Sequence, residues 1–177
     1  RAVVLSGPNQ FAPADIPKPE IGPDEILLEM KPPPSAVPIC VSLPVKRPRV
    51  YGIPPSLAMS FAESLGSGSD VKGYAVGEKV AVANVIPCHH CSSCLRGRTN
   101  ACLDRKAIGY EFDGGFEEYI RIPAICIENG NVVKLPEHVS FAAGALIEPL
   151  SCCIRGLKNA GTGFNDDVLI VGAGPIG

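Results

Sequence analysis

Four cysteines between positions 88 and 102 constrain this chain more than any other feature of its sequence. Their spacing is C-x2-C-x2-C-x7-C, and Pro87, Gly97 and Asn100 supply turns that let a short loop close around one ion. Four thiolates suit Zn(II) in a tetrahedron, and such a site leaves no open position for water or substrate. An iron–sulfur cluster and a redox-active thiol pair are the alternatives to a structural zinc ion. The predicted zinc ligands are Cys88, Cys91, Cys94 and Cys102.

The overall composition fits one globular domain, or one domain and part of a second. The 177 residues carry a formal net charge of −2, without the basic footprint of a nucleic-acid-binding protein. No apolar run approaches the roughly 20 residues that span a bilayer, and the N-terminus lacks the regions of a signal peptide. We therefore expect a soluble, cytoplasmic protein with neither nucleic acid nor membrane as a partner.

Short apolar runs separated by glycine and proline predict a small, turn-rich β domain. Eight prolines in the 24 residues from Pro32 to Pro55 exclude a helix interior or a central strand, so this stretch is expected to be loop or edge strand. The runs that we expect to form strands are 2–5, 25–30, 79–85, 117–122 and 131–135.

The pattern changes to helical after Pro136. Ser140 can cap a helix over 141–145, because its hydroxyl can accept a hydrogen bond from a free amide of the first turn. A second apolar run, 150–157, follows Pro149, which suits the first turn of a helix. Two short helices are predicted here.

The last residues resemble a phosphate-binding turn. The apolar run 168–171 is typical of a buried parallel strand and leads into G-x-G-x-x-G, whose glycines let a backbone approach a pyrophosphate. The helix and the acidic residue that complete such a site are absent, so we expect that the chain alone does not bind a dinucleotide. The candidate cofactor-binding residues are Gly172, Gly174, Pro175, Ile176 and Gly177.

Four motifs, in this order and separation, carry a resemblance to a known family. They are the four-cysteine lobe at 86–103, Asp-Gly-Gly-Phe at 113–116, Glu-Pro-Leu at 148–150, and the terminal Gly-Ala-Gly-Pro-Ile-Gly. Together they resemble the zinc-dependent medium-chain dehydrogenases, most closely the branch of polyol (sorbitol), threonine and butanediol dehydrogenases. The resemblance covers 71–177 closely and 2–30 more loosely.

This resemblance implies a mainly β fold. A GroES-like β-barrel catalytic domain with a few short helices would occupy 1–160 and include the cysteine lobe at 86–103. The first strand of a truncated Rossmann domain would occupy 161–177.

The same resemblance implies hydride transfer from an alcohol or polyol to NAD or NADP. In the family a zinc ion with an open coordination position acts as a Lewis acid on the alcohol oxygen. Cys40 matches the first ligand of that catalytic zinc, Ser42 matches the hydroxyl that starts the proton relay, and Glu148 matches the glutamate at or beside the metal. The implied partners are a small alcohol or polyol substrate and, in the full-length protein, further copies in a dimer or tetramer.

One segment departs from the family. Where the family has Gly-His-Glu-Phe, this chain has Ala-Met-Ser-Phe, and Met59 and Ser60 are poor zinc ligands. Cys40 and Glu148 alone leave two protein ligands where a catalytic zinc normally has three. Either the protein has lost its catalytic zinc, or the residues printed for 32–70 do not represent the natural sequence faithfully. The competing hypothesis for function is a non-catalytic, zinc-stabilised β module.

The remaining reactive side chains are interpreted as structural. Asp113 to Phe116 either form only a tight turn or, as in the family, lie near the substrate cleft, with Phe116 as the candidate. The histidines expected to be exposed are His89, His90 and His138. The cysteines expected in the core are Cys126, Cys152 and Cys153.

Overall fold

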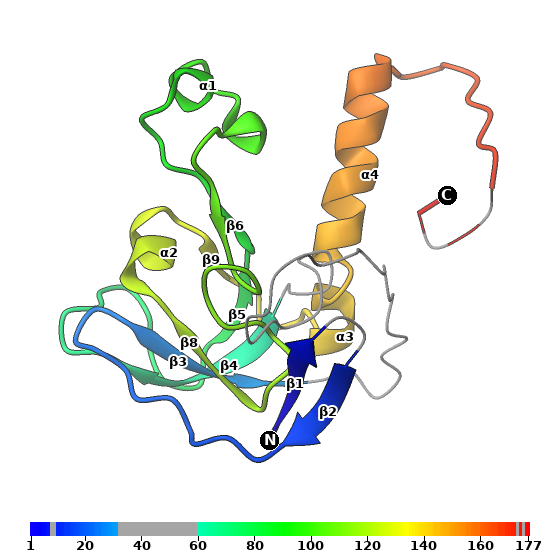
Figure 1. The fold of residues 1–177 in the computed structure, drawn as a ribbon. Helices are drawn as coiled ribbons and strands as arrows, with labels where there is room; N and C mark the ends of the chain where they lie inside the picture. The colour runs from blue at the N-terminus through cyan, green and yellow to red at the C-terminus, as the bar shows by residue number, and fades with distance from the viewer. Residues whose placement is uncertain (8–9, 32–59, 173, 175) are drawn as a thin grey trace.

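A computed structural model describes residues 1–7, 10–31, 60–172, 174 and 176–177. Within these residues the chain is mainly β with a few short helices, which confirms the predicted fold class. Figure 1 shows a twisted sheet from which two parts project, the lobe that carries α1 and the long helix α4. None of the described helices is long and apolar enough to cross a membrane.

A five-stranded antiparallel sheet forms the centre of the molecule, in the order β8-β3-β4-β5-β9. Aliphatic side chains from its strands form the core, and Leu28, Val82 and Ile120 are fully buried. Within the described residues, no further pairing closes this sheet into the expected barrel. The strands are β3 (Ile26–Met30), β4 (Ser60–Ser67), β5 (Lys79–Val82), β8 (Tyr119–Ile122) and β9 (Val132–Lys134).

A two-stranded ribbon packs beside this sheet. It joins β1 (Ala2–Gly7) to β2 (Gln10–Ala14), and Ala2 forms an isolated bridge with Glu117. The amide of Val3 donates to the carbonyl of Phe116 at 2.8 Å, so β1 is fixed to the segment that precedes β8.

All five runs predicted as strands contain one. The run 79–85 is interrupted, because β5 ends at Val82 and a separate strand β6 (Val85–Ile86) follows. The proline-rich stretch predicted as loop or edge lies outside the described residues.

The helices begin near the predicted places. Ser140 caps α3 (Phe141–Gly144), and its hydroxyl accepts from the Ala143 amide at 3.1 Å, as predicted. Helix α4 (Ile147–Ala160) begins before Pro149 rather than after it, which the first turn tolerates because its amides have no partner within the helix. A further helix, α2 (Ala124–Glu128), was not predicted.

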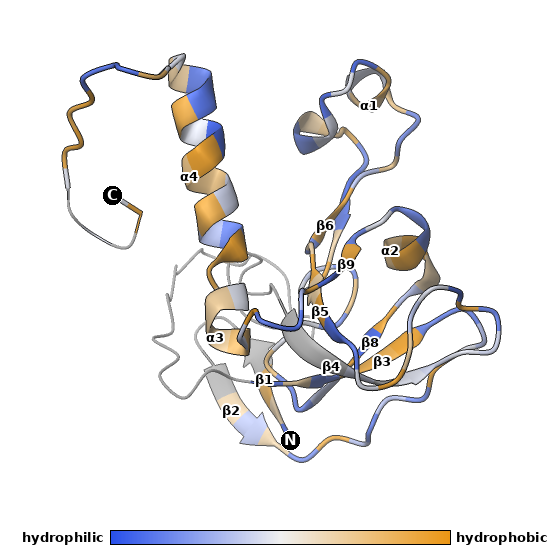
Figure 2. Ribbon diagram, turned by 180° about the vertical axis from the view of Figure 1, so that it is seen from behind, coloured by the Kyte–Doolittle hydropathy of each residue, from blue (hydrophilic) through white to orange (hydrophobic). Residues whose placement is uncertain are grey.

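Two expectations for the C-terminal part are wrong. The run 168–171 forms no strand, and Leu169 and Val171 are 88% and 93% exposed. A strand requires a hydrogen-bonded neighbour, and none of the described strands reaches this segment. Cys152 is exposed and Cys153 half-buried, because α4 buries none of its residues. Figure 2 shows this helix projecting away from the sheet. Cys126 is fully buried, as predicted.

Candidate metal centre

The cysteine lobe, residues 86–103, rises from a short ribbon in which β6 pairs with β7 (Lys106–Ala107) (Figure 1). Cys88 follows β6, Cys91 precedes α1 (Ser92–Leu95), Cys94 lies within α1, and Cys102 follows the 3-10 turn η2 (Thr99–Ala101). Three short elements therefore bring the four sulfur atoms to the same point.

Left-handed backbone turns make this convergence possible. Gly97 has φ 74°, which reverses the chain after α1, as its place in the motif predicted. His89 has φ 60°, a conformation that few side chains other than Asn, Asp and His adopt. His89 and His90 are exposed, as predicted.

The four sulfur atoms lie within 4.8 Å of one another, and Cys91 Sγ and Cys102 Sγ are 4.0 Å apart. A tetrahedral zinc with bonds of about 2.3 Å places its sulfurs about 3.8 Å apart. The observed spacing therefore fits one ion after a small contraction. All four cysteines are free thiols, so no disulfide competes for them.

Backbone amides already point at the sulfur atoms. The amide of Cys88 donates to Cys102 Sγ at 3.3 Å, that of Cys91 to Cys88 Sγ at 3.4 Å, and that of Leu103 to Cys91 Sγ at 3.5 Å. Such bonds stabilise thiolates over thiols.

The local surroundings lower the pKa of some of these thiols and raise that of another. The Leu103 amide, followed by that of Cys94, lowers the pKa of Cys91 to about 6, whereas burial raises the pKa of Cys94 to about 12. The Cys88 amide lowers the pKa of Cys102. The cluster can therefore carry some negative charge in the absence of a metal ion. A bound divalent cation would ionise the remaining thiols. The four sulfur donors, and the backbone amides that donate hydrogen bonds to them, fit a structural zinc ion.

Two asparagines fasten the base of the lobe to the sheet. Asn131 Nδ2 donates to the carbonyls of Ala83 and Val85, both at 2.8 Å, and Asn129 Nδ2 donates to Pro87 at 3.0 Å. Asn131 is 6% exposed, so these bonds are made in a buried setting. Neither asparagine was predicted as part of the site, and no sequence signal distinguishes them from turn residues.

The residues predicted for a catalytic zinc are only partly described. Cys40, Ser42 and Met59 lie outside the described residues, as does the side chain of Ser60. Glu148 stands in the first turn of α4, half-buried, and accepts from the Cys152 thiol at 3.4 Å. The helix dipole favours an acidic residue in the first turn, so the position of Glu148 does not by itself require a metal.

The predicted cofactor-binding residues do not form a phosphate site in this structure. Gly172, Gly174, Ile176 and Gly177 lie in irregular backbone, and Pro175 is outside the described residues. Their role in binding NAD or NADP stays a prediction.

Comparison with known proteins identifies the proteins to which the chain is similar. Residues 61–137, which include the whole cysteine lobe, match the alcohol dehydrogenase GroES-like domain. The chain is 33% identical to the starvation-sensing protein RspB of Escherichia coli K12 over all of its own length and 51% of that protein. It is 29% identical to the L-threonine 3-dehydrogenase of Shewanella pealeana, over 92% of this chain and 47% of that one. Residues 61–137 belong to the alcohol dehydrogenase GroES-like domain family, and the chain as a whole is similar to zinc-dependent medium-chain dehydrogenases.

A solved alcohol dehydrogenase has the same fold. The structure of the alcohol dehydrogenase rspB from E. coli CFT073, complexed with NADH, superposes with a TM-score of 0.75 at 28% identity, over 99% of this chain and 50% of that chain. The chain spans about half the length of the curated relatives that it matches.

Proposed function

We propose that the protein is a zinc- and NAD(P)-dependent oxidoreductase that transfers hydride from a small alcohol or polyol to the nicotinamide. The observation that carries this proposal is a cluster of four cysteines, able to hold one metal ion, inside a domain that matches the alcohol dehydrogenase GroES-like domain. A relative that acts on the alcohol of L-threonine and one that is complexed with NADH support the reaction class.

The cysteine lobe would serve this reaction structurally. Four protein thiolates leave no open position on the ion, so no substrate oxygen can bind there. Its ion would instead hold together α1 and η2, two elements too short to be stable alone.

A separate zinc ion, when bound, would polarise the alcohol oxygen, and NAD(P) would accept the hydride. Of the proposed residues, Cys40 and Glu148 would bind that metal and Ser42 would pass on the alcohol proton. Glu148 offers its carboxylate from a rigid helix turn, which suits a ligand.

The second candidate function is a zinc-stabilised module without catalysis. Met59 and Ser60 favour it, because they stand where the family places a histidine and a glutamate. For residues 1–177 alone we expect no turnover in either case, since the glycine motif follows no paired strand in this structure.

Zinc content separates the two candidates. Elemental analysis of purified residues 1–177 should give about two zinc ions per chain if both sites are present, and about one if only the lobe binds metal. Glu148→Gln should remove one ion from a two-zinc protein. Glu137→Gln is the matched control, because Glu137 is exposed and was not assigned to any site.

The same samples should be mixed with NAD+ or NADP+ and a panel of alcohols and polyols, and cofactor reduction followed. One zinc per chain, unchanged in Glu148→Gln, would overturn the catalytic assignment and leave the structural module. Alcohol-dependent cofactor reduction would overturn our expectation that these residues alone are inactive.

A further inference from the structure

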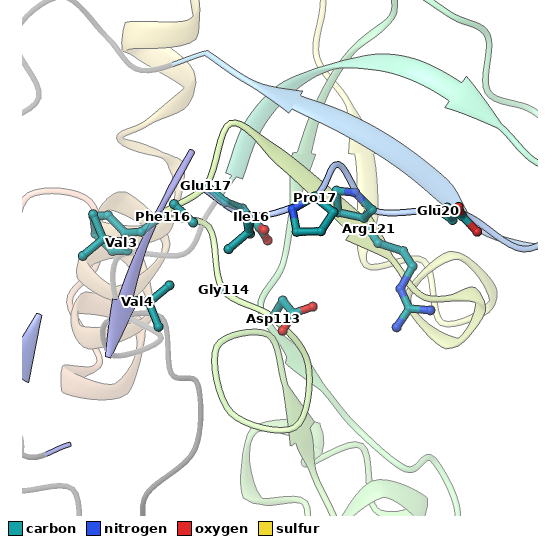
Figure 3. Close-up of a pocket in the computed structure, with 12 residues that line it drawn as sticks. Val3, Val4, Ile16, Pro17, Glu20, Asp113, Gly114, Phe116, Glu117 and Arg121 are labelled. Carbon is teal, nitrogen blue, oxygen red and sulfur yellow. The ribbon is translucent and has the colours of Figure 1, made fainter. Parts of the chain in front are cut away.

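A cavity of about 330 Å³ lies beside β1, away from the cysteine lobe. Val3, Val4 and Phe116 lie at one end of it, and Glu20 and Arg121 at the other (Figure 3). Asp113, Ile16, Pro17 and Glu117 line the middle. The volume is within the range of small-ligand sites, and the walls are mostly apolar with a few charged groups.

The rim of this cavity is fixed by backbone pairing. The carbonyl of Phe116 accepts from Val3, and the Glu118 amide donates to the carbonyl of Arg1 at 2.9 Å. On the other side the Met30 amide donates to the carbonyl of Glu118 at 2.9 Å. The segment that carries Glu117 therefore cannot turn away from the cavity without breaking these bonds.

Glu117 is the unusual group in this wall. Its Oε1 atom is buried and has no hydrogen-bond partner among the described residues. Burial, and secondarily the charge of Asp113, raise the pKa of the Glu117 carboxyl to about 8. A buried carboxyl oxygen without a donor is costly, so a ligand that supplies one would be favoured.

The nearby positive groups are engaged elsewhere. Arg121 lies 3.5 Å from Glu25, and the amino group of Arg1 lies 2.8 Å from the Glu118 carboxylate. Neither makes a recorded hydrogen bond or ion pair to Glu117 within the described part of the chain. The lining therefore sets one positive group, Arg121, against the acidic groups Asp113, Glu20 and, once its carboxyl ionises, Glu117.

A bare metal ion does not fit this arrangement. Among the described residues only the four cysteines form a group of three or more ligand atoms that could hold a metal ion, so the cavity carboxylates form no such group. A larger cation can bridge them, and the apolar side chains of Val3, Val4 and Ile16 offer contact to a hydrocarbon portion.

We propose that this cavity binds a small organic ammonium group, with Glu117 and Asp113 as its counter-charges and the apolar wall in contact with its alkyl chain. The site does not rest on the proposed dehydrogenase function, and neither zinc nor NAD(P) takes part in it. Binding would displace the carboxyl proton of Glu117, so affinity should rise with pH.

The test is calorimetric titration of residues 1–177 with butylammonium, and with butanol as the uncharged probe of equal chain length. At about pH 9 the ammonium is still charged, because primary amines titrate near 10.4, and Glu117 is largely ionised. We expect saturable butylammonium binding that weakens about tenfold or more at about pH 6 and in Glu117→Gln. Glu128→Gln is the matched control, since it removes the same charge from an exposed residue outside the cavity.

Asp113→Asn provides a second variant, because Asp113 is exposed and its change cannot unfold the core. It should weaken binding in the same direction as Glu117→Gln. Equal affinity of the wild type and Glu117→Gln, equal affinity for butanol, or an absence of saturable binding would each overturn the proposal. None of these results bears on zinc content or hydride transfer, which are measured separately.

Discussion

The cysteine lobe and the C-terminal segment 161–177 both carry a motif that sequence reasoning singled out, yet only one of them has the expected local structure. In the lobe, four sulfur atoms converge to within 4.8 Å and receive hydrogen bonds from amides of the same lobe. In the C-terminal segment the glycine motif lies in irregular backbone, and the apolar run before it is exposed.

The difference is one of range. The cysteine lobe closes over fifteen residues, and an ion bound there would supply stabilising energy, so the lobe needs little from the remaining chain. A parallel strand needs a neighbouring strand for its hydrogen bonds and helices on both faces for its side chains. The described residues offer neither to 168–171.

The largest expected effect comes from breaking the lobe. Cys91→Ser removes one thiolate from the tetrahedron, so residues 1–177 should lose one zinc equivalent and the fold should be destabilised. Elemental analysis and thermal unfolding measure the two effects, and amide hydrogen exchange over 88–103 shows whether the loss is local. Cys152→Ser is the control, because Cys152 lies on α4 and outside the lobe.

Unchanged zinc content and unchanged thermal stability in Cys91→Ser would contradict this prediction. If zinc is lost but the amide hydrogens of the lobe exchange no faster, the hydrogen bonds from backbone amides to sulfur hold the lobe together without metal.

The sequence predicts features that depend on local patterns better than features that depend on distant parts of the chain. The five expected runs that contain a strand, the cap of α3, the buried Cys126 and the clustering of the four cysteines follow from local patterns of apolar residues, turns and cysteine spacing. Strands β2, β4 and β7 were not predicted. The exposure of Cys152 and of Leu169 could not be predicted, because apolar neighbours indicate burial only where another element covers them. The hydrogen bonds that the side-chain amide of Asn131 donates depend on two carbonyls more than forty residues away, and no local sequence pattern shows them.

The next largest effect is expected from a substitution in the core of the sheet. Its size gives a reference against which the effects in the lobe and in the C-terminal segment can be compared. Leu28 on β3 is fully buried, so Leu28→Ala should lower the free energy of unfolding by about 2–5 kcal/mol. Denaturant unfolding measures this, with Leu95→Ala as the control, since Leu95 is 75% exposed. A loss below about 1 kcal/mol would mean that the sheet is not the cooperative unit on which the lobe stands.

A smaller effect is expected where the lobe meets the sheet. Asn131→Ala leaves the carbonyls of Ala83 and Val85 without their donors in a buried setting, which should cost about 1–3 kcal/mol. Asn129→Ala, which removes one bond at 3.0 Å from a half-buried residue, should cost less. If the two variants unfold at the same denaturant concentration as the wild type, the lobe does not depend on the sheet through these amides.

The smallest effect is expected in the C-terminal segment. Leu169 is 88% exposed and belongs to no strand, so Leu169→Ala should change the free energy of unfolding by less than about 0.5 kcal/mol. The amides of 168–171 should exchange as fast as those of an unstructured peptide, because no described strand pairs with them. A loss above about 1 kcal/mol or protected amides would show that this run is packed and paired in solution. Its glycine motif would then stand after a formed strand, as a phosphate-binding turn requires, and the contrast with the lobe would disappear.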